Sequence, residues 1–274
     1  MVLDWADSTD SDLAGYRVYR SASPVGPFSQ LGHTLSASAM TDLAPLLGSS
    51  SYAVAAVDRA GQESARVTLS VSRRVTLRGV SSASRAGVKS LSVDRPPNVA
   101  ADDVLLAVVV TPSSTVLKAP NGWSLVRTDV SGTALRQSLY ARRVAASEPG
   151  SYSWSVAGKD DMSIAVLAYR GADGSVLPVA GGSVTASSVS ISSASVPTTA
   201  GHLLVSAFAV RGTAALTEPA TYDARVRVVS STATSTTLLV TDALATTTGM
   251  TTVPRATSVQ PTTGVGAALS WRAL

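Results

Sequence analysis

Two continuous runs of strand-forming residues constrain the fold more than any other feature of this sequence. The first is Val104–Val110, preceded by Ala101-Asp-Asp103, and the second is Leu203–Val210, preceded by Ala200-Gly-His202. A strand that is apolar at every position belongs where both of its faces are covered, because successive side chains point to opposite sides. Both runs are far too short to cross a membrane as a helix. We therefore expect both to be central strands of packed sheets.

Further landmarks recur at a nearly constant spacing from the two runs. They predict that residues 80–274 form a duplicated domain, with halves at 80–172 and 183–274. The two halves should contain similar sets of strands related by a pseudo-twofold, with the two runs as equivalent central strands. The recurring pairs are Pro120 with Pro219, Trp123 with Tyr222, Ser138-Leu139 with Thr237-Leu238, and Ala168-Tyr169-Arg170 with Ser270-Trp271-Arg272.

The composition favours an all-β chain. Of the 274 residues, 45% are hydrophobic and the mean hydropathy is +0.24, so the chain can form a packed core. Ala and Val supply most of the apolar residues, while Ser and Thr fill alternate positions, which suits strands with one solvated face. No segment shows a sustained 3.6-residue apolar stripe with helix caps. Short strands separated by turn residues in 2–72 are typical of a β-sandwich.

The first quarter of the chain contains three motifs, which are Leu3-Asp-Trp5, Asp12-Leu-Ala-Gly-Tyr-Arg-Val-Tyr-Arg20 and Ala56-Val-Asp-Arg-Ala-Gly-Gln-Glu-Ser64. Together they resemble a bacterial fibronectin type III module. The resemblance implies a sandwich over residues 1–72 with Trp5 as its core tryptophan. It also implies a spacer or adhesion module rather than a catalyst.

This module departs from the family at two places. The first strand of the family should precede Val2 and is missing, and Ser50 stands where many members carry a tyrosine-corner residue. The segment Val2–Trp5 should therefore be an unpaired sheet edge, which invites another strand. We expect residues upstream of Met1 to supply that strand. A neighbouring chain or the following domain are the alternatives.

The second part of the chain has motifs of its own, which are Pro120-Asn-Gly-Trp123-Ser-Leu-Val126, Glu148-Pro-Gly-Ser-Tyr-Ser-Trp154-Ser-Val156 and Ala168-Tyr-Arg-Gly171. They resemble a jelly-roll-type repeat of actinobacterial secreted proteins and phage tail proteins. The resemblance implies display on a surface or virion, and it implies no reaction. The junction at 72–80 lacks Pro- or Gly-rich character, so we expect a stiff and partly paired connection.

Several kinds of function are disfavoured by what the sequence lacks. There is no cysteine, which excludes disulfides, thiol catalysis and Cys-ligated zinc. The net charge is +4, but the arginines are scattered, with doublets only at 73–74 and 142–143, so no nucleic-acid surface is predicted. The two histidines, His33 and His202, have no neighbouring carboxylate cluster, and no nucleophile or phosphate-loop motif is present. We expect no catalytic residues and no cofactor.

One short acidic loop is a candidate metal site. Asp7, Asp10 and Asp12 offer three carboxylates, the ligands that calcium prefers, although the spacing is not that of an EF-hand. Asp and Ser also favour turns by bonding their own backbone, and we favour that interpretation over calcium binding. Asp160 and Asp161 form a similar but weaker candidate.

The aromatic residues are the best candidates for ligand binding. Trp123, Trp154 and Trp271 are expected in the core, because tryptophan is generally buried and two of the three stand at repeated positions. Tyr140 and Tyr222 are the aromatic side chains expected to be exposed, and they are the candidate glycan-binding residues.

These observations predict a non-catalytic structural or adhesive module of a surface-displayed, secreted or phage-tail protein. The alternative is a glycan-binding accessory module of a secreted carbohydrate-active enzyme. The partners expected are other modules of the same polypeptide or assembly, a cell-surface glycan, or further copies joined by strand addition. No nucleic acid and no membrane insertion are expected, and the location would be extracellular, at a cell surface or in a virion.

Overall fold

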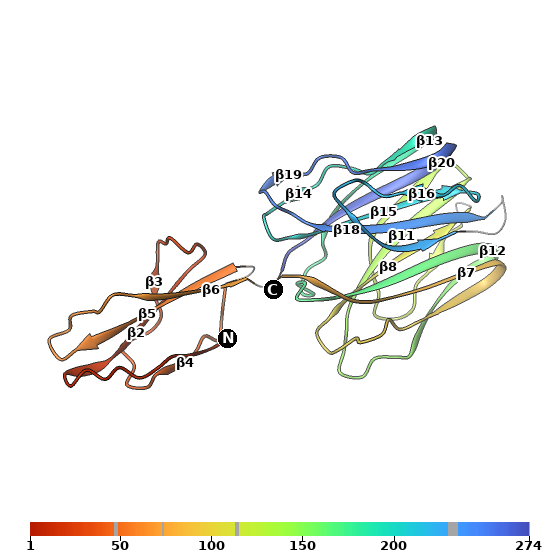
Figure 1. Ribbon diagram of the computed structural model, residues 1–274. Helices are drawn as coiled ribbons and strands as arrows, with labels where there is room; N and C mark the ends of the chain where they lie inside the picture. The colour runs from red at the N-terminus through yellow and green to blue at the C-terminus, as the bar shows by residue number, and fades with distance from the viewer. Residues whose placement is uncertain (47–48, 73, 113–114, 230–234, 274) are drawn as a thin grey trace. The chain divides into compact units, whose positions relative to one another are not determined.

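The computed structural model describes all residues except 47–48, 73, 113–114, 230–234 and 274. Its regular elements are all β-strands, which confirms the predicted all-β class (Figure 1). The chain divides into two compact units, Met1–Arg74 and Val75–Ala273. Each unit is described by itself. In the expected junction, one strand ends at Ser72 and the next begins at Thr76, while residue 73 lies outside the described residues.

Unit Met1–Arg74 is a small sandwich of two strands against four. One sheet pairs β1 with β4, and the other has the order β3-β2-β5-β6. Leu3, Val18 and Tyr52 form its buried core, and Trp5 packs against them with its ring edge-to-face on Tyr16 at 5.5 Å. The strands are β1 (Val2–Asp4), β2 (Leu13–Ser21), β3 (Ser29–Gln30), β4 (Ala39–Thr41), β5 (Ser49–Asp58) and β6 (Val67–Ser72).

Unit Val75–Ala273 contains two sheets with the same strand order. The first sheet runs β7-β12-β8-β11-β10 and the second runs β13-β20-β15-β18-β17. A short extra strand pairs with the second strand of each order, β9 with β12 and β16 with β20. The strands of the first sheet are β7 (Thr76–Asp94), β8 (Val104–Thr111), β9 (Leu117–Lys118), β10 (Ser124–Ser131), β11 (Leu135–Arg143) and β12 (Ser151–Arg170).

The second sheet repeats this pattern element by element. Its strands are β13 (Val179–Ser192), β15 (Leu203–Arg211), β16 (Leu216–Thr217), β17 (Asp223–Val228), β18 (Thr236–Leu244) and β20 (Arg255–Trp271). A separate two-stranded sheet pairs β14 (Pro197–Thr198) with β19 (Gly249–Met250). The predicted equivalence and central position of the two apolar runs are confirmed, since β8 and β15 each stand third of five.

Backbone hydrogen bonds in the loops repeat as well. The N–H of Trp123 donates to the carbonyl of Pro120 at 3.4 Å, and the N–H of Tyr222 donates to the carbonyl of Pro219 at 3.0 Å. An antiparallel bridge joins Ala172 to Ala273, near the ends of the two halves. The duplication therefore extends from the strand order to individual turns.

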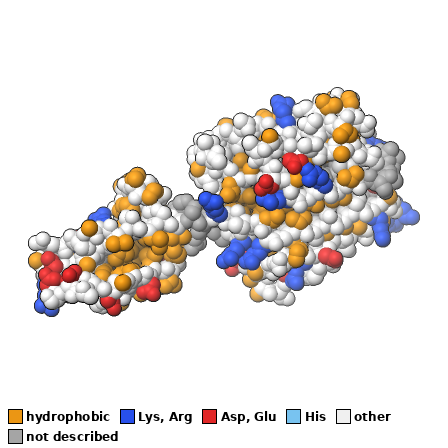
Figure 2. Space-filling model, in the orientation of Figure 1, with side chains coloured by type: hydrophobic (Ala, Val, Ile, Leu, Met, Phe, Trp, Pro, Cys, Tyr) orange, Lys and Arg blue, Asp and Glu red, His pale blue; other side chains and the backbone are white. Residues whose placement is uncertain are grey.

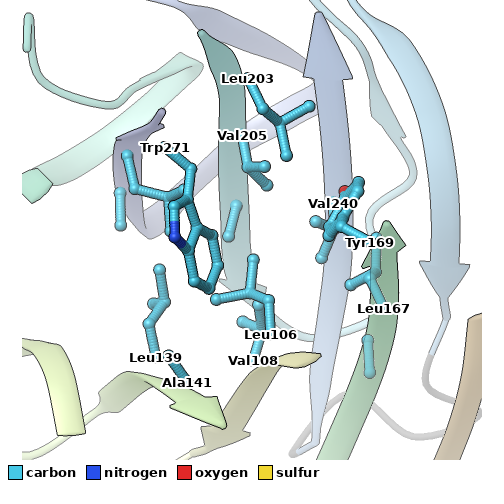
Figure 3. Close-up of a cluster of buried hydrophobic side chains, with 14 of the residues drawn as sticks. Leu106, Val108, Leu139, Ala141, Leu167, Tyr169, Leu203, Val205, Val240 and Trp271 are labelled. Carbon is cyan, nitrogen blue, oxygen red and sulfur yellow. The ribbon is translucent and has the colours of Figure 1, made fainter. Parts of the chain in front are cut away.

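Three hydrophobic layers stack through this unit. The middle layer lies between the two sheets and combines alternate residues of β8 and β15 with those of their neighbours (Figure 3). A second layer covers the other face of β8, through Leu105, Ala107 and Val109, and a third covers the other face of β15, through Phe208 and Val210. All eight residues of β8 are buried for this reason. The apolar run Val104–Val110 is continuous because neither face of this strand is solvated.

A long strand pair supplies the outer cover of the first half. Leu91 and Val93 of β7 pair with Trp154 and Tyr152 of β12 and pack on the outer face of β8. The ladder between β7 and β12 is irregular around Asp160, where the strand pair bends. A single strand pair thus serves both as part of the sheet and as the cover over it.

Candidate functional site

The acidic loop forms a turn. Asp7, Asp10 and Asp12 are all exposed, and Ser8 Oγ donates to Asp10 Oδ2 at 2.8 Å. The N–H of Leu13 donates to the carbonyl of Asp10 at 3.2 Å. In the described part of the chain, no three carboxylate or imidazole groups lie close enough to hold a metal ion. The geometry favours the turn, and calcium binding stays a prediction.

The weaker acidic candidate ties β7 to β12. Asp161 accepts the N–H of Gly87 at 2.8 Å, across the ladder between β7 and β12. Asp160 accepts the N–H of Asp161 at 2.9 Å. Both carboxylates therefore bond backbone N–H groups where this strand pair is irregular.

The prediction of an exposed Tyr140 is wrong. This side chain is 6% exposed and lies in the outer layer of the first half, with its ring 6.2 Å from that of Trp154. The physical reason is that β11 is covered on both faces, so alternation along the strand leaves no solvated side for Tyr140. Burial raises the pKa of the Tyr140 hydroxyl. Tyr222 is half-buried beside its turn, and burial raises its pKa too.

The tryptophans of the second unit are buried, as expected. Trp123 contacts both Tyr152 and Trp154 edge-on, with ring centroids 5.1 Å apart in each case. Trp271 lies in the middle layer between the sheets (Figure 3). None of the four Trp, seven Tyr and two Phe side chains, all of them in described residues, is exposed. The surface of the described chain therefore has no aromatic strip on which a sugar chain could stack.

The two histidines lie in different units. His33 is exposed in the first. His202 is half-buried in the second, with Nδ1 at 3.1 Å from Ser270 Oγ, and burial followed by the charge of Arg272 lowers its pKa. The described residues form no helix that is long and apolar enough to cross a membrane.

An apolar groove opens in unit Met1–Arg74, between β1 and β6. Its volume is about 380 Å³. Val67 and Leu69 of β6 pair with Val54 and Tyr52 of β5, so these side chains share one face of the four-stranded sheet. That face is the inner one, because Tyr52 packs in the core. Val67 and Leu69 are nevertheless 76% and 59% exposed, because nothing in the described chain covers them.

The edge of β1 borders this groove. The N–H of Trp5 donates to Ser38 at 3.0 Å, and the carbonyl of Met1 accepts from Asp42 at 2.8 Å, so the odd-numbered residues face β4. The N–H and C=O groups of Val2 and Asp4 therefore point the other way, along a free edge. In Figure 2, hydrophobic side chains gather between β6 and the N-terminus on the visible face of this unit. The groove offers an apolar surface for the side chains of an added strand, and the edge offers free N–H and C=O groups for its backbone.

A pair of cavities occupies equivalent places in the second unit. The cavity beside Leu203 and Asp242 has a volume of about 510 Å³, and the one beside Val104 and Ala141 has about 90 Å³. Val104 and Leu203 begin the two central strands, and the residues two positions further along pair with Ala141 and Asp242 respectively. The positions match, but the sizes differ.

The larger cavity contains a fixed polar network. Tyr169 donates from its hydroxyl to Asp242 Oδ2 at 3.0 Å, and Arg225 Nε donates to Asp242 Oδ1 at 2.7 Å. Arg225 Nη2 donates to Asp223 Oδ2 at 2.9 Å. Burial raises the pKa of Asp242 even though Arg225 is its partner, and burial raises the pKa of Tyr169 well above its ordinary value. The Asp242 side chain is 4% exposed and that of Asp223 is 74% exposed, so the network leads from the core to solvent.

The smaller cavity has an aromatic ring in its wall. Trp271 lines it and is buried, and its Nε1 donates to the carbonyl of Asp173 at 2.8 Å. Ser124 and Ala141 stand where the other half has Asp223 and Asp242. The sequence analysis missed Asp223, Arg225 and Asp242. A charge comparison between the two halves at these paired positions would have found them.

No protein-family model, no curated protein and no solved structure matches this chain.

Proposed function

We propose that this chain is a non-catalytic structural or adhesive module of a surface-displayed, secreted or phage-tail protein, and that it joins its neighbouring module by strand addition at β1. The observation that carries the proposal is the uncovered apolar groove beside the free edge of β1. Two strands against four, with the gap beside β1, also support the fibronectin type III-like assignment. The repeated strand order supports the jelly-roll-like assignment of the second unit.

The occupant we propose is a single extended segment of the same polypeptide. Its backbone would pair with Val2 and Asp4, and its alternate side chains would cover Val67 and Leu69. A covalently connected strand has a high effective concentration, so it keeps the groove covered when the protein is dilute. Strand addition from a second copy would cover the groove only at high concentration.

The glycan-binding alternative receives less support in its original form. That form requires exposed rings, and Tyr140 is in the core while Tyr222 is half-buried. An accessory module that binds an extended sugar chain on a flat face would place its aromatic side chains at the surface.

Single cysteines test the proposal, because the chain has no thiol of its own. Leu69→Cys would be made in the isolated 274-residue chain and in the native polypeptide within its assembly, and the rate of labelling by a maleimide would be measured. Val25→Cys is the control, since Val25 is 91% exposed in the same unit. We expect the thiol at position 69 to react like the control in the isolated chain and about tenfold or more slowly in the native polypeptide, because strand pairing must open first.

Each other outcome has a definite meaning. Equal labelling of positions 69 and 25 in the native polypeptide would refute strand docking. Protection that appears in the isolated chain only as its concentration rises would replace the same-chain strand with a strand from a second copy.

A further inference from the structure

The cavity beside Asp242 differs from its counterpart in a way that the fold does not require. The first half builds the same strand order with neutral Ser124 and Ala141 at the positions of Asp223 and Asp242. Burying a carboxylate is costly unless it is paired, and the second half adds Arg225 as that partner. Because one half folds without these groups, their presence in the other indicates a local use.

The network fixes the guanidinium of Arg225 between two carboxylates. Nε and Nη2 are engaged, which leaves Nη1 as a donor, and Asp223 keeps Oδ1 as an acceptor. Asp242 has both oxygens engaged, by Arg225 and Tyr169. The surface of the cavity therefore presents a donor and an acceptor side by side, and the bonds of Asp242 to Arg225 and Tyr169 anchor this arrangement.

The two carboxylates and the single guanidinium leave a net negative charge at the cavity, which disfavours an anionic ligand. A neutral ligand with adjacent hydroxyl groups satisfies both free positions, since one hydroxyl donates to Asp223 and its neighbour accepts from Arg225. Figure 2 shows acidic and basic side chains close together over β18, among hydrophobic ones.

Apolar side chains form most of the remaining walls, together with Thr76 and Thr221. Val75, Leu77, Leu203 and Leu244 line the cavity, and its volume of about 510 Å³ lies within the range of about 300–1,000 Å³ that small-molecule sites occupy. A sugar ring has hydroxyl groups at its edge and C–H groups on its face. The hydroxyl groups suit the polar network of the cavity, and the C–H face suits its apolar walls. We propose that the cavity formed by β7, β15, β17 and β18 binds a neutral sugar residue, with Asp223 and Arg225 holding two adjacent hydroxyls.

This site does not depend on the strand-docking groove, which lies in the other unit. It also differs from the aromatic glycan site expected from the sequence, because it encloses one sugar residue instead of stacking a chain. An adhesive module with such a pocket would recognise the exposed end of a glycan.

Ligand-observed saturation-transfer NMR on the intact chain tests the site. The probes are methyl glucoside, methyl galactoside, methyl mannoside and N-acetylglucosamine at millimolar concentration, with glucuronic acid as an anionic comparator. We expect transfer to at least one neutral probe and weaker transfer to glucuronic acid. Asp223→Ala should weaken the binding of that probe about tenfold, the loss of one charge-assisted hydrogen bond.

Two further variants serve as controls for the site of binding. Ser124→Ala changes the equivalent position in the first half and should leave binding unchanged. Leu244→Trp should block the cavity and abolish binding, while unchanged thermal unfolding shows that each variant is folded. Transfer to no neutral probe, stronger binding of glucuronic acid than of every neutral probe, or equal binding by the wild type and Asp223→Ala would each overturn the proposal.

Discussion

The two units of this chain differ in how completely their sheets are covered. In Val75–Ala273 both faces of the central strands β8 and β15 are buried, and three hydrophobic layers stack through the unit. In Met1–Arg74 a single small core lies between two strands and four, and Val67 and Leu69 stay exposed on an inner face. The difference indicates a self-sufficient scaffold in the second unit and, in the first, a sandwich one strand short.

The largest effect should come from the core of the second unit. Trp154→Ala removes a fully buried ring and should cost about 3–5 kcal/mol. Since 1 kcal/mol shifts the midpoint by roughly 2–4 °C in a domain of this size, scanning calorimetry should show the transition of this unit falling while that of the first unit stays. Trp154→Phe should cost less, because the indole N–H of Trp154 has no partner to lose. Equal shifts of both transitions would contradict independent units.

A backbone contact in the second sheet should give an intermediate effect. A Cβ at Gly266 of β20 would lie 2.2 Å from the carbonyl oxygen of Ser192, so the strand would have to shift. Gly266→Ala should therefore cost about 1–3 kcal/mol, the usual range for overpacking, measured by urea unfolding. Gly158→Ala is the matched control, because a Cβ there meets nothing within 4 Å. A neutral Gly266→Ala would mean that the layers are looser than described.

Acid should change the contributions of Glu63 in the first unit and Asp242 in the second unit in opposite directions. Hydrogen bonds from Tyr19 and then Arg17 lower the pKa of Glu63 to about 2, so its contribution is present above the unfolded-state pKa near 4.5 and is lost as pH falls towards 2. Burial raises the pKa of Asp242, so the stability linked to this group is full below about 3.8 and declines as pH rises through its folded-state pKa.

The unfolding midpoints of the two units, measured between pH 2 and 7, check this contrast. Glu63→Gln should flatten the acid loss of the first unit. Asp242→Asn should steepen the acid loss of the second unit, because hydrogen bonds, including those from Arg142 and Arg272, lower the pKa values of Glu148 and Asp173 there and Asp242 no longer offsets their protonation. If Glu63→Gln leaves the acid profile of the first unit unchanged, the hydrogen bonds from Tyr19 and Arg17 do not stabilise its ionised form.

The smallest effect should come from the groove. Leu69→Ser in the 274-residue chain should change stability by less than about 0.5 kcal/mol, because the side chain is largely exposed there. Chemical unfolding of the first unit measures this value. A cost comparable with that of a buried leucine would show that the groove is already covered in the isolated chain.

How much the sequence predicts depends on whether the signal is local. The apolar runs at β8 and β15 predict buried central strands, and the spacing of Pro120 and Pro219 indicates the duplication. The expected exposure of Tyr140 is wrong because residues of β7 and β12 cover that face of β11, and no local pattern around Tyr140 encodes this cover. The network of Tyr169, Arg225 and Asp242 joins distant parts of the sequence through the packing of two sheets, which no local pattern encodes.

Native-state hydrogen exchange of the intact chain tests the contrast between the two units most directly. If one unit is complete and the other is one strand short, the amides of β8 and β15 should exchange only by global unfolding. The amides of Val2 and Asp4 at the free edge should exchange on the order of a thousandfold faster or more. Protection of Val2 and Asp4 equal to that of β8 and β15 would contradict the account, because it would mean that the edge of β1 is already paired.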